Sequence, residues 1–153
     1  MKYTLKSLIL TTTLVIALTF FSACGKEQAP EVFIKDTTLV PYLNFYNTTF
    51  ERHYDAHLTV NMEVSKNLGT CTKPHRIVAY INAWEKVHLT ERQKTVVMLH
   101  EFGHCDLKLG HDDSKFPDGC RVSIMATHVL GQYCIDLHWG EYISELKNKA
   151  KGK

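Results

Sequence analysis

Residues 90–107, TERQKTVVMLHEFGHCDL, decide the fold, because they predict one well-defined helix. Thr90 and Gln93 stand three residues apart in the capping-box pattern, which marks the start of a helix. An apolar run then leads into the segment HEFGH at residues 100–104, and the helix is expected to run to about Leu107. The chemistry of the protein is therefore expected on this helix.

The segment HEFGH fits the pattern H-E-x-x-H. On a helix this spacing places His100 and His104 on one face, so their imidazoles can converge on one metal ion. Glu101 then points toward the open side of the metal, where a carboxylate can take a proton from a zinc-activated water and later deliver it to a leaving amine. A helix whose two histidines and glutamate bind no metal is the alternative that the motif alone leaves open.

The wider segment HEFGHCDLKLGH at residues 100–111, followed by Ser-Ile-Met at residues 123–125, resembles the zinc-binding consensus and Met-turn of the metzincin metallopeptidases. The resemblance covers roughly residues 90–125. It implies a small zincin-like α+β domain that binds Zn²⁺. The residues it assigns to the site are the zinc ligands His100, His104 and His111, the general base Glu101, and Met125 beneath the metal.

The turn that follows the second histidine departs from the metzincin pattern. Leu107 stands where the family has a glycine, and His111 falls one position later than the family's third histidine. Gly110 is expected to supply the left-handed conformation that reverses the chain before His111. A further departure is Thr127, which occupies the place where some metzincins carry a catalytic tyrosine.

Other candidates for the third ligand stay open. Asp112 or Asp113 could bind the metal in place of His111, which they follow directly. A different class of zincin takes its third ligand from a glutamate on a later helix, and Glu141 and Glu145 lie in such a segment. His111 is favoured because a glycine and then a histidine follow the motif within a dozen residues.

Upstream of the motif, the sequence predicts two strands and an early helix. Residues 57–64 alternate apolar and polar side chains, as expected of a half-buried strand. Residues 76–81 are rich in β-branched and aromatic side chains and predict a second strand, which by the metzincin resemblance would border the cleft and pair with an extended substrate. Residues 66–74 are expected to be a loop that carries Cys71, and part of 41–52 is expected to be helical.

The region after the motif is expected to be largely irregular. Residues 108–120 are rich in glycine, aspartate and proline and predict a loop, and a poorly defined connection follows. At residues 139–149 apolar side chains return at helical spacing and predict a closing amphipathic helix. The expected fold class is α+β, a twisted sheet with an active-site helix and an irregular C-terminal part that ends in a helix.

The N-terminus has the features of an export signal. An uncharged, mostly apolar run at residues 8–21 follows two lysines and is too short to span a bilayer comfortably. It ends in FSAC, which resembles a bacterial lipobox and implies that Cys24 is lipidated and anchors the protein to a bacterial membrane; cleavage near Ala23 without lipidation is the alternative. The expected organisation is a lipoprotein-type signal peptide at 1–23, the lipidated cysteine and a linker at 24–31, and a zinc metallopeptidase domain at 32–153.

Four cysteines remain when Cys24 is set aside, namely Cys71, Cys105, Cys120 and Cys134. An even number in an exported chain favours two disulfides, and the lack of a C-x-x-C pair argues against a structural zinc site. The connectivity does not follow from sequence. We favour Cys105 with Cys120, which would tie the active helix to the loop after it, and Cys71 with Cys134.

These patterns favour an enzyme of the cell envelope. The formal net charge of +2, with both signs interspersed, argues against a nucleic-acid partner. The expected function is zinc-dependent hydrolysis of peptide bonds in a peptide or protein substrate, with Glu101 as general base. The rival hypothesis is a non-catalytic envelope lipoprotein that holds metal for structure or storage. Glu101 discriminates between them, because a site without catalysis needs ligands but no base beside an open position.

Overall fold

The computed structural model describes residues 35–73 and 75–152, so the expected signal peptide, Cys24 and linker lie outside the described residues. The described chain has the α+β class that the sequence predicts. Its elements are α2 (Val40–Phe50), β1 (His57–Asn61), β2 (Gly69–Lys73), β3 (Arg76–Tyr80), α3 (Ile81–Lys86), α4 (Glu91–Cys105) and α5 (Gln132–Lys151). Among these helices, none is long and apolar enough to cross a membrane.

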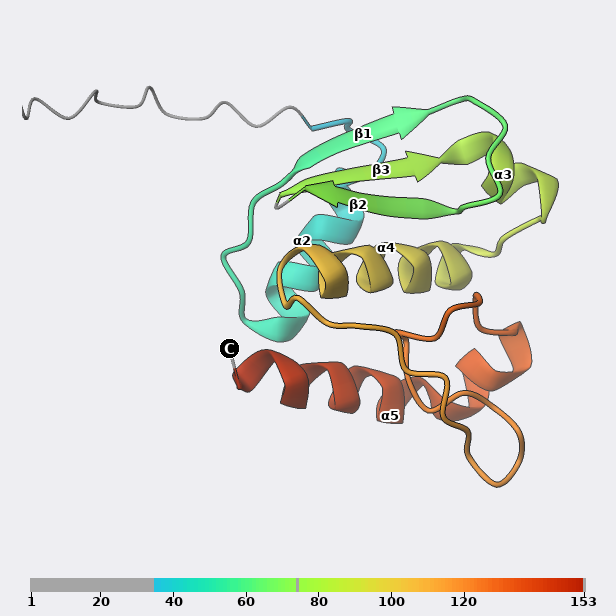
Figure 1. The fold of residues 1–153 in the computed structure, drawn as a ribbon. Helices are drawn as coiled ribbons and strands as arrows, with labels where there is room; N and C mark the ends of the chain where they lie inside the picture. The colour runs from blue at the N-terminus through green and yellow to red at the C-terminus, as the bar shows by residue number, and fades with distance from the viewer. Residues whose placement is uncertain (1–34, 74, 153) are drawn as a thin grey trace, which may run out of the picture. The chain divides into compact units, whose positions relative to one another are not determined.

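The three strands form one mixed sheet in the order β1-β3-β2 (Figure 1). β1 pairs with β3 in parallel, with Leu58 opposite Ile77, and both of these side chains are fully buried. β2 pairs with β3 in the antiparallel direction. The strand at residues 76–80 is therefore central, and the expectation that it borders the cleft is wrong.

β2 is an edge strand that the sequence analysis took for a loop. The prediction for residues 66–74 is wrong at Gly69–Lys73, which form the edge of the sheet. The glycine at its start and the proline just beyond its end are typical of loops, and they hid the short β-branched pattern of Thr70 and Thr72 between them. A glycine in a strand often marks a place where another part of the protein approaches closely, and Gly69 lies against the side chain of Glu101.

α4 lies between the sheet and α5 (Figure 1). It contacts β2 and β3 on one side and α2 and α5 on others. Its core-facing residues include Val96, Leu99 and Phe102, which are almost completely buried. Phe102 packs against the ring of Tyr46 from α2, with ring centroids 4.9 Å apart. These contacts on several sides hold α4 in a fixed position relative to the edge strand.

α5 begins earlier than the sequence predicts. It starts at Gln132, takes in Cys134, and bends at His138, whose backbone leaves the helical region. The first part of α5 buries only Ile135 and exposes Tyr133 and Leu137, so its sequence lacks the amphipathic pattern of the second part.

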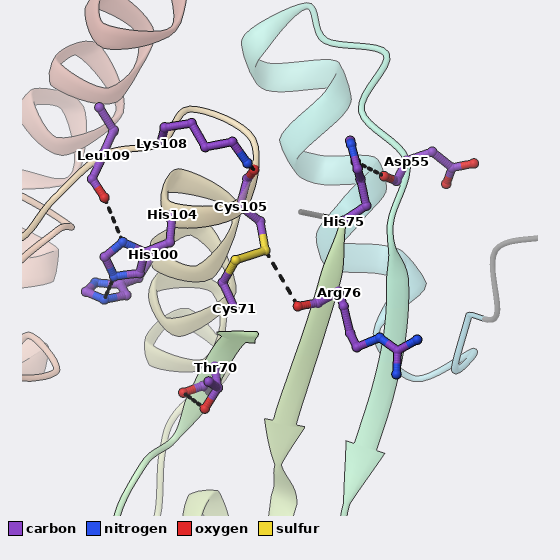
Figure 2. The surroundings of a disulfide bond; sticks show 11 residues. Asp55, Thr70, Cys71, His75, Arg76, His100, His104, Cys105, Lys108 and Leu109 are labelled. Atoms are coloured by element: carbon purple, nitrogen blue, oxygen red, sulfur yellow. Dashed lines mark hydrogen bonds between the residues drawn. A yellow bond between two sulfur atoms is a disulfide. The ribbon is translucent and has the colours of Figure 1, made fainter. Parts of the chain in front are cut away.

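Two disulfides are present in the described part of the chain, as the cysteine count predicts, but the favoured connectivity is wrong. Cys71 pairs with Cys105 and Cys120 pairs with Cys134. The first bond joins edge strand β2 to the last residue of α4 (Figure 2). The second joins the loop after α4 to the first turn of α5. The error follows from the missed strand, because β2 is what brings Cys71 alongside α4.

Candidate metal centre

α4 begins with the capping box that the sequence predicts. The backbone N–H of Gln93 donates to Thr90 Oγ1 at 3.2 Å, and the backbone N–H of Thr90 donates to Gln93 Oε1 at 3.1 Å. This cap fixes the start of the helix, and the helix then continues to Cys105. His100 and His104 consequently lie one turn apart, with their ring centroids 4.5 Å from each other.

The structure brings His100, His104 and His111 together. His104 Nε2 lies 2.9 Å from His100 Nε2 and 3.2 Å from His111 Nε2. These three residues form a group of side chains whose ligand atoms lie close enough to hold one metal ion. With zinc–nitrogen distances of about 2.0–2.1 Å, two nitrogen ligands of a tetrahedral ion lie roughly 3.3–3.4 Å apart. The spacing of the three Nε2 atoms therefore suits a small cation between them.

Backbone carbonyls orient two of the three rings. His100 Nδ1 lies 2.9 Å from the carbonyl oxygen of Ile124, and His104 Nδ1 lies 2.7 Å from that of Leu109. A carbonyl can only accept a hydrogen bond, so both rings carry their proton on Nδ1 and leave Nε2 as a lone pair when neutral. Metal-binding histidines are commonly oriented in this way.

The facing nitrogens make the three-histidine group a candidate site for a cation. Burial lowers the pKa of His100 to about 4, against a weaker opposite effect of the Ile124 carbonyl, so this ring is neutral near pH 7. Nε2 of His100 faces Nε2 of His104 at 2.9 Å, and two lone pairs at this distance repel unless a proton or a metal ion lies between them. The donor set therefore fits a metal such as zinc, for which neutral imidazole is a common ligand.

The chain reverses after α4 by a different device from the one expected. Lys108 adopts the left-handed conformation, with φ of 53°, whereas Gly110 does not. The backbone N–H of Leu109 donates to the carbonyl of Gly103 at 3.0 Å, and the carbonyl of Leu109 accepts from His104. The expectation for Gly110 is wrong because the turn is already complete at Leu109, one residue earlier.

The segment at residues 123–126 forms a tight turn behind α4. The backbone N–H of Ala126 donates to the carbonyl of Ser123 at 3.2 Å. Met125 is fully buried, and a Cβ added to Gly103 would lie only 2.4 Å from its sulfur. Gly103 stands between Glu101 and His104 on α4, so the methionine packs directly against the helix at the level of the candidate ligands.

Glu101 is buried between α4 and the edge strand, with only 6% of the residue exposed. A Cβ at Gly69 would lie 2.8 Å from Glu101 Cγ, so only glycine allows the strand to approach this closely. Desolvation raises the pKa of Glu101 to about 7, and a hydrogen bond with the backbone of Cys71 acts in the opposite direction. The carboxyl group therefore changes protonation near neutral pH, which suits a general base.

The alternative third ligands are engaged elsewhere. Asp112 Oδ1 accepts from Ser114, and both carboxylate oxygens of Asp113 accept from Thr127. Glu145 bonds to Ser123, and Glu141 is largely exposed beside His138. A second cluster has metal-binding residue types, namely Asp118, Cys120 and His138. Its cysteine is in a disulfide, and its Asp118 Oδ2 lies 2.7 Å from His138 Nε2.

Several residues of the site escaped the sequence analysis. The contribution of β2, through Gly69 and the amide of Cys71, depended on a strand that was not predicted. The carbonyls of Ile124 and Leu109 carry no side-chain signal, because any residue type offers the same group. The isolated glycine at residue 69, seven residues before the start of the predicted strand at residue 76, was the one available hint, since such glycines can mark close approach.

Comparisons of the chain with protein-family models, curated proteins and solved structures found no match. The metzincin resemblance therefore rests on the motif residues alone. The function is argued below from the geometry of the site.

Proposed function

We propose that this protein is a zinc-dependent endopeptidase with a zincin-like fold. The observation that carries the proposal is the convergence of three histidine Nε2 atoms, two of them on rings oriented by backbone carbonyls, beside a buried glutamate. His100, His104 and His111 would hold the metal. Three protein ligands with one position left for water is the usual arrangement of a catalytic zinc site, whereas structural sites have four protein ligands.

Glu101 is the proposed general base. When bound, zinc supplies Lewis acidity, which makes water a competent nucleophile near neutral pH and polarises a carbonyl. Glu101 takes the proton of the attacking water and passes it to the nitrogen of the leaving amine as the peptide bond breaks. In the metal-free protein burial raises the pKa of Glu101 to about 7, so this carboxyl group is able both to accept and to release a proton near neutral pH. The amide of Cys71 holds the carboxylate in place while it does so.

The edge strand β2 is the proposed docking strand for an extended peptide substrate. Among the described residues β2 has only β3 as a strand neighbour, so a further strand could add at its other edge through backbone groups other than the Cys71 amide, which bonds to Glu101. Gly69 of β2 lies against Glu101. A peptide that extended the sheet at this edge would therefore run past the carboxylate, and backbone pairing would bind it with little dependence on its sequence.

Metal analysis combined with one isosteric variant tests this function. We expect the purified protein to hold one zinc ion and to cleave members of a broad peptide library. Glu101→Gln should keep the zinc and lower kcat by about 10²- to 10⁴-fold, the usual contribution of a general base. Glu85→Gln, which changes an exposed glutamate on α3, is the matched control and should leave both unchanged.

Two results would count against the proposal. Stoichiometric zinc without hydrolysis of any library member would favour the non-catalytic metal-binding lipoprotein. Zinc retained at full occupancy in either His100→Ala or His104→Ala would remove the metal site from this position on α4.

The location of the enzyme is part of the proposal and rests on the sequence alone. Export and lipidation at Cys24 would hold the domain at the cell envelope, within reach of peptide or protein substrates there. The mass of the N-terminal peptide of the mature protein tests this. A diacylglyceryl-modified cysteine is expected, and an unmodified N-terminus at Cys24 would indicate cleavage without an anchor.

A further inference from the structure

The turn at residues 123–126 connects α5 to the histidine cluster. On its outer side, the carbonyl of Ile124 accepts from His100 Nδ1 at 2.9 Å. The carbonyl of Met125, next along the turn, accepts from the backbone N–H of Asp112 at 2.9 Å. Asp112 directly follows His111 in the chain. The turn therefore contacts one candidate ligand and the neighbour of another, so its conformation affects both.

A buried serine links this turn to α5. Ser123 is fully buried, and its Oγ accepts from the backbone N–H of Met125 at 3.0 Å. The same hydroxyl donates to Glu145 Oε1 on α5, also at 3.0 Å. Since a hydroxyl has only one proton to donate, the acceptor on α5 sets its direction and leaves a lone pair for the amide of Met125.

Lys149 extends the same network to the third histidine. Its Nζ pairs with Glu145 Oε1 one turn earlier in α5 and lies 3.8 Å from Asp112 Oδ2. The pair Glu145 and Lys149 thus contacts the turn that orients His100 and also the residue that follows His111.

We propose that Glu145 is a positioning residue of the three-histidine centre. Through Ser123 it holds the turn in the conformation that presents the Ile124 carbonyl to His100. Through Lys149 it restrains Asp112 beside His111. The inference rests on the metal site of the proposed function, but it does not depend on peptidase activity.

A role limited to α5 itself is the simpler alternative. Glu145 and Lys149 are four residues apart and could merely stabilise the helix, a contribution of about 0.2–0.5 kcal/mol for such pairs. That role needs no burial. Glu145 Oε2 is buried without a hydrogen-bond partner among the described residues, and burying a carboxylate oxygen in this way is unfavourable. Glu145 is held in this position while its Oε1 accepts the hydrogen bond from Ser123 of the turn.

Zinc affinity and the visible spectrum of the cobalt-substituted protein test the inference. Glu145→Ala should weaken zinc binding by about 10- to 100-fold, as measured by competition with a chelator, because residues that orient ligands have effects of this size. The cobalt absorption bands should shift, since they report ligand geometry. Glu141→Ala is the matched control, because it removes the same charge from an exposed site one turn away on α5 and should change neither readout.

Two more variants separate positioning from folding. Glu145→Gln keeps an oxygen that can accept from Ser123, so it should restore most of the affinity. Ser123→Ala removes the link itself and should weaken zinc binding as Glu145→Ala does, with a combined effect smaller than the sum of the two. These two variants also decide the matter if Glu145→Ala does not fold.

A lower melting temperature of the metal-free Glu145→Ala protein, with zinc affinity and cobalt spectrum unchanged, would overturn the inference and leave the proposed function intact. Zinc binding that depends on Glu145, in a protein that hydrolyses no peptide, would support the inference and contradict the proposed function. A wild-type protein with no affinity for zinc would contradict both.

Discussion

His111 reaches the other two histidines from a chain that has already left the helix. Its Nε2 lies 3.2 Å from that of His104, although His111 itself is exposed. The left-handed Lys108 and the two bonds made at Leu109 turn the chain back toward α4. The extra residue relative to the metzincin spacing is absorbed in this turn, so the late position of His111 does not prevent convergence.

The first prediction concerns this third ligand. His111→Ala should weaken zinc affinity by at least about 10-fold, the low end of the effect of losing even a residue that only orients a ligand. Asp112→Ala and Asp113→Ala should have smaller effects, because their carboxylates bond to Ser114 and Thr127 instead of the metal. Chelator competition measures all three. Full zinc occupancy and activity in His111→Ala, together with their loss in Asp112→Ala or Glu141→Ala, would disprove the metzincin assignment while leaving the H-E-x-x-H motif in place.

The second prediction follows from the pKa of Glu101 in the metal-free protein. Burial raises this pKa from 4.5 to about 7. Between these pH values the folded protein holds a proton that the unfolded chain has released, so Glu101 lowers the free energy of unfolding as the pH rises. Glu101→Gln removes this effect. The variant should therefore gain stability over wild type from about pH 4.5 to 7, by roughly 3 kcal/mol at about 1.4 kcal/mol per pKa unit.

Urea denaturation of both proteins in the presence of a chelator, repeated across this pH range, measures the difference in the free energy of unfolding. His100 titrates with the opposite sign, because its pKa is lowered to about 4. The comparison of two proteins that both retain His100 removes that contribution. A stability difference that stays constant with pH would show that Glu101 is not desolvated as described.

At the scale of elements, the Cys71–Cys105 disulfide fastens the edge strand to the active helix. Cys105 follows His104 directly and pairs with Cys71 of β2 (Figure 2). The amide of Cys71 bonds to Glu101. The same strand carries Gly69 against the Glu101 side chain. The position of the carboxylate therefore depends on the registration of β2 with α4, which the disulfide secures.

The third prediction compares the two disulfides. Their cysteines are 34 and 14 residues apart in the sequence, and loss of either bond should destabilise the protein by about 3–4 kcal/mol in the chain-entropy estimate. Cys71→Ser/Cys105→Ser should also lower kcat while zinc remains bound, because it loosens the strand beside Glu101. Cys120→Ser/Cys134→Ser is the matched control, because it should lose a similar amount of stability without affecting the strand beside Glu101. Equal losses of kcat in the two double variants, measured below their melting temperatures, would contradict the role assigned to β2.

At the scale of the whole molecule, three segments of the chain build the candidate metal site, two with ligands and one with a supporting turn. His100 and His104 come from α4, His111 comes from the following loop, and the turn at residues 123–126 supports His100 from behind. α5 then covers this turn through Glu145. The loop between α4 and α5 contains no helix or named strand, so these contacts, the Cys120–Cys134 bond and the buried Ile124 and Leu130 hold it in place.

The fourth prediction is that zinc stabilises this arrangement. A metal that binds only the folded state adds about 2.7 kcal/mol of stability at a free concentration 100 times its dissociation constant. A chelator should therefore lower the melting temperature of the wild-type protein by several degrees. The melting temperature of His100→Ala/His104→Ala should not respond to chelator. Equal responses of the two proteins would place the stabilising metal elsewhere.

The sequence by itself determined the features that depend on residues close together in the chain or on composition. Thr90 and Gln93 predicted the start of α4, and the four-residue spacing of His100 and His104 predicted that both lie on one face. The even number of cysteines predicted two disulfides. The helix inferences succeed because caps and helical periodicity depend on residues within one or two turns of each other. The disulfide inference succeeds because an even number of cysteines in an oxidising compartment can pair completely.

Only the tertiary structure decided the features that depend on contacts between residues far apart in the sequence. Edge strand β2 exists because β3 pairs with it, and this pairing in turn places Cys71 beside Cys105 and Gly69 against Glu101. The carbonyls of Ile124 and Leu109 orient the histidines through backbone groups that every residue shares, so no residue type could reveal them. The raised pKa of Glu101 has the same origin, because desolvation is a property of what packs around a carboxylate and not of the glutamate itself.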